Sequence, residues 1–195
     1  MSAILKAARG GRIPINPAVV ISNRPDALGL ASAKRLGVET RVIESRGFAG
    51  DRWGYDQRIV SALKDCGVTP ENGLVCLAGF MRIISPQFVR MYRNRILNIH
   101  PALLPAFPGL DAQGQAVKYG AKCSGCTVHL VDEGVDTGPV ILQDVVRVRD
   151  DDTAESLSER ILRREHILYP RAVNLFATGR IKIEGRRTII EDPPA

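Results

Sequence analysis

Short apolar runs alternate with amphipathic stretches through the first half of the chain. The apolar runs are expected to be β-strands at residues 18–21, 40–43, 73–77 and 96–99. Apolar residues at helical spacing predict helices over residues 27–35 and 55–66, each followed by a glycine that can end a helix. This alternation indicates an α/β fold with a mostly parallel sheet flanked by helices.

The second half has longer elements. Residues 127–131 and 140–148 are expected to be strands, joined by the acidic loop 132–136. A long helix should follow, with Asp152 as its N-cap and Glu155 completing a capping box. A β-hairpin with its turn at Gly185 is expected after this helix. No linker divides the chain, so residues 1–195 are expected to form one domain.

Composition agrees with a globular protein. The 195 residues are 45% hydrophobic and 25% charged, and no apolar run is long enough to span a membrane. No signal peptide is visible, so a cytoplasmic location is expected. The net charge of +6 comes from scattered basic residues, which favours a small anionic substrate over nucleic acid. We therefore expect neither a nucleic-acid nor a membrane partner.

Two of the four cysteines, Cys123 and Cys126, have the spacing of a redox or metal pair. A redox pair usually begins a helix, whereas this pair precedes an expected strand. A zinc site would need a second pair of ligands, and the sequence has no other CxxC or CxxH. We interpret both as ordinary thiols and expect no metal.

Asn98 and His100 carry the densest chemical signal. They lie two residues apart on an extended segment, so their side chains share a face. An amide can stabilise a developing oxyanion while an imidazole moves protons, which suits acyl transfer. Taken alone, the pair is more typical of a structural histidine.

The surrounding motifs change that interpretation. Residues 98–105 are Asn-Ile-His-Pro-Ala-Leu-Leu-Pro, followed by Gly-Cys-Thr-Val-His at 125–129 and Asp-Thr-Gly-Pro at 136–139. Ala-Gly-Phe-Met-Arg-Ile precedes them at 78–83. In order and spacing these motifs resemble the folate-dependent formyltransferase family, and within it the phosphoribosylglycinamide formyltransferases of purine synthesis. The resemblance covers nearly the whole chain and implies the Rossmann-like formyltransferase fold.

The resemblance implies a reaction. A formyl group passes directly from 10-formyltetrahydrofolate to the primary amine of glycinamide ribonucleotide (GAR), with no covalent enzyme intermediate and no metal. Asn98 and protonated His100 would stabilise the oxyanion, and His100 would assist proton transfer to the departing folate nitrogen. Asp136 is expected to hold His100 in its protonated form, because a nearby carboxylate favours the imidazolium.

The resemblance also implies binding residues. Glu165 would contact the amine end of GAR. His129 lies on an expected strand between Val128 and Leu130, and we interpret it as supporting rather than catalytic. A loop over the pteridine and an apolar hinge would bind the folate. The folate-binding candidates are Arg52, Met81, Arg82, Ile83, Ile84, Asn98, Asp132, Glu133, Gly134, Val135 and Asp136.

The beginning of the chain departs from the family. Family members start with a strand and a Gly-Ser-Asn phosphate loop, whereas Met1 aligns inside the helix that follows that loop. The first strand is therefore expected to be absent, and the domain N-terminally truncated. We interpret Met1 as an internal methionine of a longer protein; the rival interpretation is a real truncation, which would cost the sheet a central strand.

Three alternatives remain open. Methionyl-tRNA formyltransferase and formyltetrahydrofolate hydrolase resemble the same core but carry additional domains. A chain without the phosphate loop could also be an inactive folate-binding fragment. The sequence leaves monomer and homodimer equally open.

Overall fold

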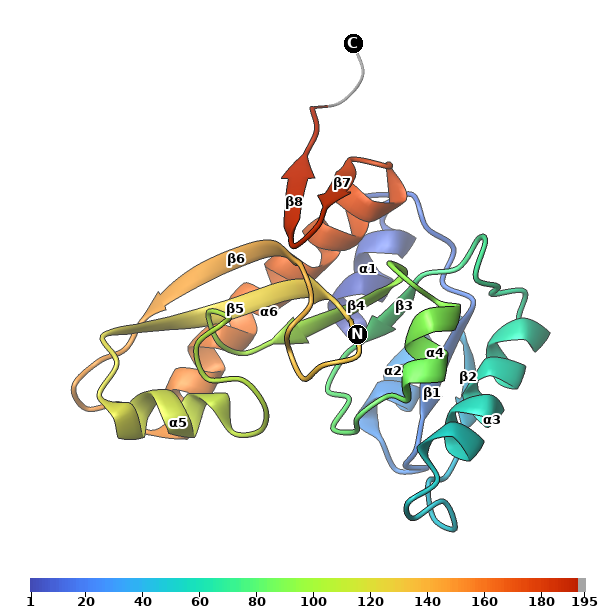
Figure 1. Ribbon diagram of the computed structural model, residues 1–195, viewed down its shortest axis with the longest axis horizontal. Helices are drawn as coiled ribbons and strands as arrows, with labels where there is room; N and C mark the ends of the chain where they lie inside the picture. Colours follow the sequence, from blue (N-terminus) through green and yellow to red (C-terminus); the bar gives the residue numbers. More distant parts are fainter. Residues whose placement is uncertain (193–195) are drawn as a thin grey trace.

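The chain alternates helices and strands in its first half, and long antiparallel strands, a long helix and a β-hairpin follow (Figure 1). The computed structural model describes residues 1–192. The helices are α1 (Ser2–Arg9), α2 (Leu28–Arg35), α3 (Arg52–Asp65), α4 (Pro86–Met91), α5 (Ala112–Tyr119) and α6 (Ala154–Ala177). The strands are β1 (Val19–Ser22), β2 (Glu39–Val42), β3 (Val75–Leu77), β4 (Ile96–His100), β5 (Cys123–Leu130), β6 (Val140–Arg147), β7 (Ile181–Glu184) and β8 (Arg187–Ile190).

The strands confirm an α/β fold with a mixed sheet. β1 pairs with β2 and β3 pairs with β4 in parallel, whereas β5 and β6 add to β4 in antiparallel orientation. Within residues 1–192, β1 and β3 are not hydrogen-bonded to each other, so the strands form a two-stranded and a four-stranded piece besides the β7–β8 hairpin. The expected absence of the family's first strand stays a prediction.

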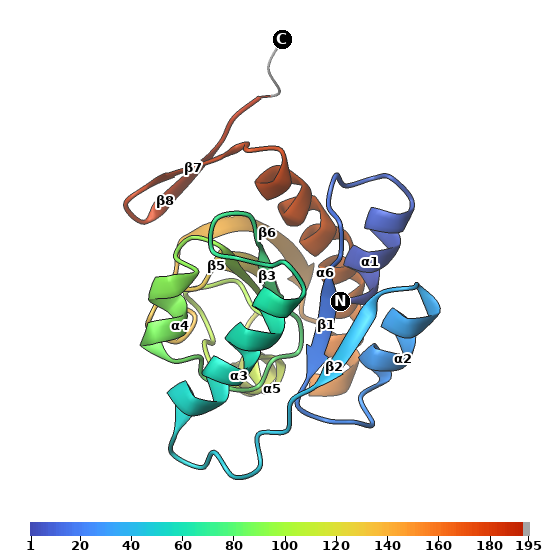
Figure 2. The same ribbon diagram turned by 90° about the vertical axis from the view of Figure 1, so that its right-hand side faces the viewer.

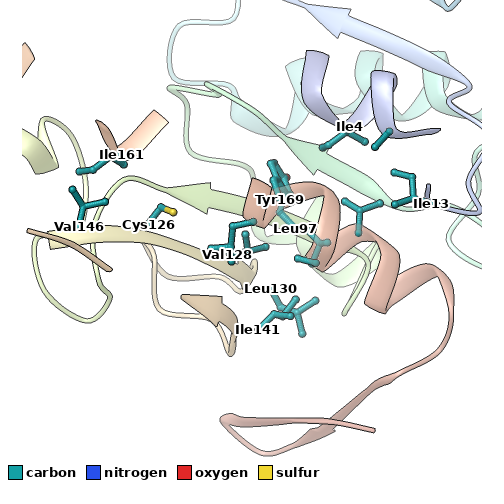
Figure 3. Close-up of a cluster of buried hydrophobic side chains, with 14 of the residues drawn as sticks. Ile4, Ile13, Leu97, Cys126, Val128, Leu130, Ile141, Val146, Ile161 and Tyr169 are labelled. Atoms are coloured by element: carbon teal, nitrogen blue, oxygen red, sulfur yellow. The ribbon is translucent and has the colours of Figure 1, made fainter. Parts of the chain in front are cut away.

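Helices cover the strands on both sides. α1, α2 and α6 lie on one side, and α3 and α4 lie on the other (Figure 2). α6 is the central helix of the larger core, because Leu157, Ile161 and Val173 are fully buried against β5 and β6 (Figure 3). Every residue of β5 from Ser124 to Leu130 is buried, so this strand lies at the centre of the fold.

A smaller core lies under α3 and α4. Val60 and Leu63 of α3 pack with Phe88 of α4, and Ile96 of β4 joins them. The Phe88 and Tyr92 rings stack with centroids 5.1 Å apart. This packing fixes the segment between β3 and α4, which contains the predicted folate hinge.

Two local expectations need correction. The N-cap of α6 is Thr153 and not Asp152, and the capping box is completed by Ser156 and not Glu155. Asp152 instead accepts from the Arg149 backbone N–H and pairs with the Arg160 guanidinium, so its carboxylate is already engaged. The short helices α4 and α5 were not expected, because neither has a long apolar period.

No helix in the described part of the chain is long and apolar enough to cross a membrane. Even α6 is strongly amphipathic, with charged residues along the side that faces solvent.

Tyr169 joins α6 to two strands at once. Its hydroxyl is 2.8 Å from the Leu77 carbonyl oxygen and 2.9 Å from that of Leu97, and the residue is only 3% exposed. A buried carbonyl that loses its donor keeps an uncompensated desolvation cost. The Tyr169 hydroxyl therefore links the ends of β3 and β4 that lead into the candidate site.

We expect Tyr169→Phe to lower the free energy of unfolding by about 1 to 2 kcal/mol, because both carbonyls lose a buried partner. Urea denaturation measures the change. Tyr119→Phe is the matched control, since Tyr119 is 81% exposed and should change little. Equal effects of the two substitutions would contradict this role of Tyr169.

Candidate active site

The end of β4 brings Asn98 and His100 into the middle of the sheet. Asn98 lies between Leu77 of β3 and His129 of β5, and His100 lies opposite Thr127. Residues two apart on a strand point to the same face, so the Asn98 and His100 side chains are neighbours. The strand register therefore also brings His129 to the predicted pair.

Asp136 reaches this face from the loop between β5 and β6. Its φ is +53°, a left-handed conformation that aspartate tolerates better than most residues. Gly138 lets the loop return against β5, because a Cβ there would lie 1.8 Å from the Leu130 carbonyl oxygen. The Asp132 carboxylate accepts from Gly134 N–H and from the Thr137 hydroxyl, which closes the loop on itself.

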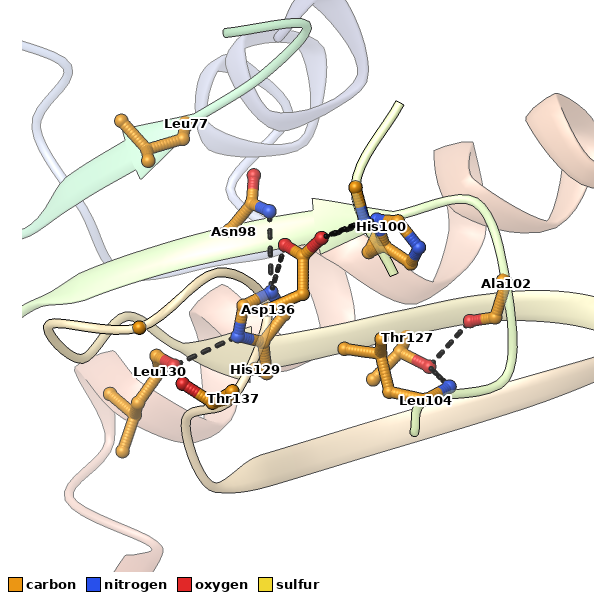
Figure 4. Close-up of polar contacts among 12 residues, drawn as sticks. Leu77, Asn98, His100, Ala102, Leu104, Thr127, His129, Leu130, Asp136 and Thr137 are labelled. Atoms are coloured by element: carbon orange, nitrogen blue, oxygen red, sulfur yellow. Dashed lines mark hydrogen bonds and ion pairs between the residues drawn. The ribbon is translucent and has the colours of Figure 1, made fainter. Parts of the chain in front are cut away.

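The Asp136 carboxylate is the centre of the cluster (Figure 4). Its Oδ2 accepts a 2.8 Å bond from Gly109 N–H and lies 3.3 Å from His100 Nδ1. Its Oδ1 lies 3.6 Å from His129 Nε2. The structure thus brings together the three predicted catalytic residues.

His100 is surrounded by acceptors. Its Nδ1 faces Asp136, and its Nε2 lies 2.8 Å from the Phe107 carbonyl oxygen. A carbonyl oxygen cannot donate, and neither can an ionised carboxylate, so only a ring with a proton on each nitrogen satisfies both contacts. The ring is 4% exposed, which excludes water as a substitute partner.

His129 lies beside the Asn98 amide. Its Nδ1 is 2.8 Å from the Leu130 carbonyl oxygen, so Nδ1 carries a proton. Its Nε2 lies 3.2 Å from Asn98 Nδ2 and 3.6 Å from Asp136 Oδ1. A ring without a proton on Nε2 accepts one Asn98 hydrogen, whereas a ring with one donates to Asp136, so in both cases an amide hydrogen remains for a substrate oxygen.

The pKa of Asp136 lies below its usual value. Burial raises the pKa of this carboxyl, but the His129 ring, the Gly109 N–H and the charge of His100 together lower it by more. The site therefore favours the carboxylate over the neutral acid.

Thr127 is a functional residue that sequence reasoning missed. Its hydroxyl donates to the Ala102 carbonyl at 2.6 Å and accepts from Leu104 N–H at 3.0 Å. Gln143 Nε2 donates to the same hydroxyl. These bonds fix the turn after His100. In the sequence, only the motif at residues 125–129 pointed to Thr127, because its hydrogen-bond partners lie about two dozen positions away.

The predicted hinge residues take two directions. Met81 and Ile83 are 75% and 55% exposed, whereas Arg82 and Ile84 turn inward. The Arg82 guanidinium carbon lies 4.7 Å from the centre of the Tyr55 ring, and Ile84 packs on the smaller core. Arg82 therefore contacts the protein rather than an open site.

The other folate candidates lie around the loop after β5 and on α3. Glu133 forms a 3.1 Å ion pair with Arg90 of α4, which ties this loop to the helix after the hinge. Val135 is 49% exposed. Arg52 is the first residue of α3 and is exposed.

Glu165 lies apart from the cluster. It is half-buried on α6, and within residues 1–192 no hydrogen bond or ion pair joins it to Asn98, His100 or Asp136. Burial raises the pKa of its carboxyl. Its predicted role in substrate binding stays a prediction.

A broad open groove lies elsewhere, between the end of β6 and α6. Arginines line much of it, but Arg160 is paired with Asp152 and Arg164 with Asp144, and no residue of the cluster reaches it. Its size therefore does not make it the candidate site. In the described part of the chain, no three His, Cys, Asp or Glu side chains converge as metal ligands.

The chain belongs to the formyl transferase family, which residues 1–173 match. It is 51% identical to glycinamide ribonucleotide transformylase 1 from Symbiobacterium toebii, whose crystal structure superposes with a TM-score of 0.93 over 98% of this chain and 88% of that one. It is 39% identical over 183 residues to phosphoribosylglycinamide formyltransferase of Escherichia coli K12, covering 94% of this chain and 84% of that protein.

A longer relative matches over a small part of its length. The chain is 46% identical over 181 residues to the trifunctional purine biosynthetic protein adenosine-3 of Drosophila melanogaster. The match covers 92% of this chain but only 13% of that protein. The similarity therefore concerns only the part of the longer protein that this chain matches.

We expect the stability difference between the wild type and Asp136→Asn to depend on pH. A carboxyl with a lowered folded-state pKa stabilises the fold above its unfolded pKa, and that contribution is lost as pH falls through the folded value. The advantage of the wild type should therefore shrink between about pH 5 and pH 2. Chemical denaturation across this range measures it, and a pH-independent difference would refute the assignment.

Proposed function

We propose that this protein transfers the formyl group of 10-formyltetrahydrofolate to the primary amine of GAR. The convergence of Asn98, His100 and Asp136 at the end of β4 carries the proposal. Relatives that share most of this chain's length are named for this transfer. The product is formyl-GAR, an intermediate of purine (IMP) synthesis.

The chemistry requires an oxyanion site and a proton donor. The GAR amine attacks the formyl carbon, and the formyl oxygen becomes negatively charged in the tetrahedral intermediate. A hydrogen of the Asn98 amide supports that oxygen, because the amide lies on the same face of β4 as His100. When the carbon–nitrogen bond to folate breaks, the attacking amine gives up one proton and the leaving nitrogen takes one up, and His100 assists this proton transfer.

Before His100 can contact the substrate, its ring must exchange one hydrogen-bond partner. Its Nδ1 stays on Asp136, while Nε2 must leave the Phe107 carbonyl to reach the substrate. Phe107 has a φ of +52° and belongs to the loop before α5. A shift of the Phe107 carbonyl that leaves Gly109 N–H on Asp136 frees a pre-aligned N–H, and the Asp136 carboxylate keeps the ring in place.

The folate co-substrate has a flat apolar ring with polar edges. Met81, Ile83 and Val135 offer apolar surface, which in a soluble protein often marks a ligand site. Arg82 and Ile84 contribute through the backbone of the hinge, and residues 132–136 form the loop over the ring. Arg52 supplies a positive charge on the folate side.

The remaining assignments follow from the same reaction. Glu165 binds the amine end of GAR, and no metal takes part. The partners are small molecules, without nucleic acid or membrane, and the protein acts in the cytoplasm as a monomer or homodimer. Residues 1–195 belong to a single formyltransferase domain.

Formyl transfer is tested with purified protein, 10-formyltetrahydrofolate and GAR. The proposal predicts formyl-GAR formation with little release of formate. Formate release at the same rate without GAR would replace transfer by hydrolysis, with water as the acceptor at the same three residues. Binding of folate without either product would indicate a folate-binding fragment.

We expect His100→Ala to reduce the rate of transfer by about 100- to 10,000-fold, the range typical of a general acid. Folate binding should persist, because the hinge is untouched. Single-turnover transfer and equilibrium folate binding measure the two effects. His166→Ala is the matched control on the exposed side of α6. Near-normal transfer by His100→Ala would overturn its role.

A further inference from the structure

Asp56 is a buried carboxylate that the reaction does not use. It lies in the second turn of α3 and is 3% exposed. Its Oδ2 accepts a 2.7 Å hydrogen bond from Ser85 N–H, which is 29 positions further along the chain. A hydrogen bond between a carboxylate and a backbone N–H is among the stronger ones in proteins. Asp56 therefore ties α3 to the residue directly after the hinge.

Ser85 continues this connection into α4. It is 2% exposed, and its hydroxyl caps the helix by accepting a 3.3 Å bond from Phe88 N–H. Its backbone N–H and its side chain thus have different partners. The end of the hinge is fixed on both sides, by α3 through Asp56 and by α4 through its own hydroxyl.

Tyr55, the neighbour of Asp56 on α3, holds the middle of the hinge. The Arg82 guanidinium lies over its ring, 4.7 Å from the ring centre. The ring itself is fixed, because its hydroxyl donates to the Ile43 carbonyl at 2.9 Å and the edge of Phe48 packs against it. A cation over an immobilised aromatic ring is a directional contact.

These two anchors decide which hinge side chains face outward. Arg82 lies over the Tyr55 ring and Ile84 packs on the smaller core, so both point toward the protein. Met81 and Ile83 consequently point outward and remain largely exposed. A hinge released at Ser85 could rotate, and these apolar side chains would lose their common direction.

We propose that Asp56 is a positioning residue for the folate co-substrate, acting through Ser85 on the direction of Met81 and Ile83. The inference rests on the proposed function, because it assumes that the hinge contacts folate. Asp56 touches no reacting atom, so it should affect folate binding much more than the chemical step or the binding of GAR. For this role, the side chain at position 56 needs an oxygen that accepts the hydrogen bond from Ser85 N–H.

The test compares three variants. Asp56→Ala removes the acceptor, Asp56→Asn keeps an acceptor oxygen without the charge, and Asp65→Ala makes the same chemical change at an exposed position of α3. For each we would measure kcat, the KM of both substrates, and equilibrium binding of a non-reactive 10-formylfolate analogue. Hydrogen exchange over residues 79–85 reports the hinge without any activity.

We expect Asp56→Ala to raise the folate KM and the analogue Kd by about tenfold, the size of a lost hydrogen bond to a charged group. The GAR KM and kcat should stay within about twofold, and exchange over 79–85 should become faster. Asp56→Asn should restore most of the folate affinity, and Asp65→Ala should resemble the wild type. If Asp56→Ala does not fold, Asp56→Leu replaces it, because it fills the space without an acceptor oxygen, with the same expected rise in analogue Kd.

Unchanged folate affinity, or equal losses for both substrates, would overturn the proposal. The analogue measurement separates it from the proposed function. If the wild type binds the analogue but transfers no formyl group, the proposed function fails while the role of Asp56 in folate binding can still be confirmed. If the wild type transfers formyl and Asp56→Ala keeps its folate affinity, only the positioning role fails.

Discussion

The contact between the Asp136 carboxylate and the two histidines is the constraint on which the site depends. One carboxylate holds His100 through Oδ2 and faces His129 through Oδ1, while Gly109 N–H fixes its direction. Each of these partners comes from a different part of the chain. The loop conformation at Asp136, the return at Gly138 and the burial of β5 all serve to bring the carboxylate to this point.

The sheet supplies the rest of the geometry. The parallel β3–β4 pair carries the hinge and the Asn98–His100 face to the same edge, and the antiparallel β5 places His129 opposite Asn98. Tyr169 closes this arrangement from α6 by bonding to carbonyls of both β3 and β4. Asn98, His100 and His129 therefore lie on strands, whereas Asp136 reaches them from the loop after β5.

Sequence reasoning was most successful where the signal was local. Apolar periodicity located most of the strands and the long helices, and the spacing of Asn98 and His100 placed them on one face. The inclusion of Asp136 came from a family resemblance, because nothing local connects it to residues 27 or more positions earlier. Thr127 and Asp56 were missed for the same reason, since each acts through a hydrogen bond to a distant backbone group. The cap of α6 was wrong because Asp152 has a competing partner in Arg160.

A double-mutant cycle between His100 and Asp136 tests the central claim most directly. The rate of formyl transfer would be measured for the wild type, His100→Ala, Asp136→Asn and the double variant. If Asp136 acts through His100, its loss should cost little once the imidazole is gone, and the double variant should be about as slow as His100→Ala. Losses that multiply in the double variant would show that the two residues act independently and would contradict the account.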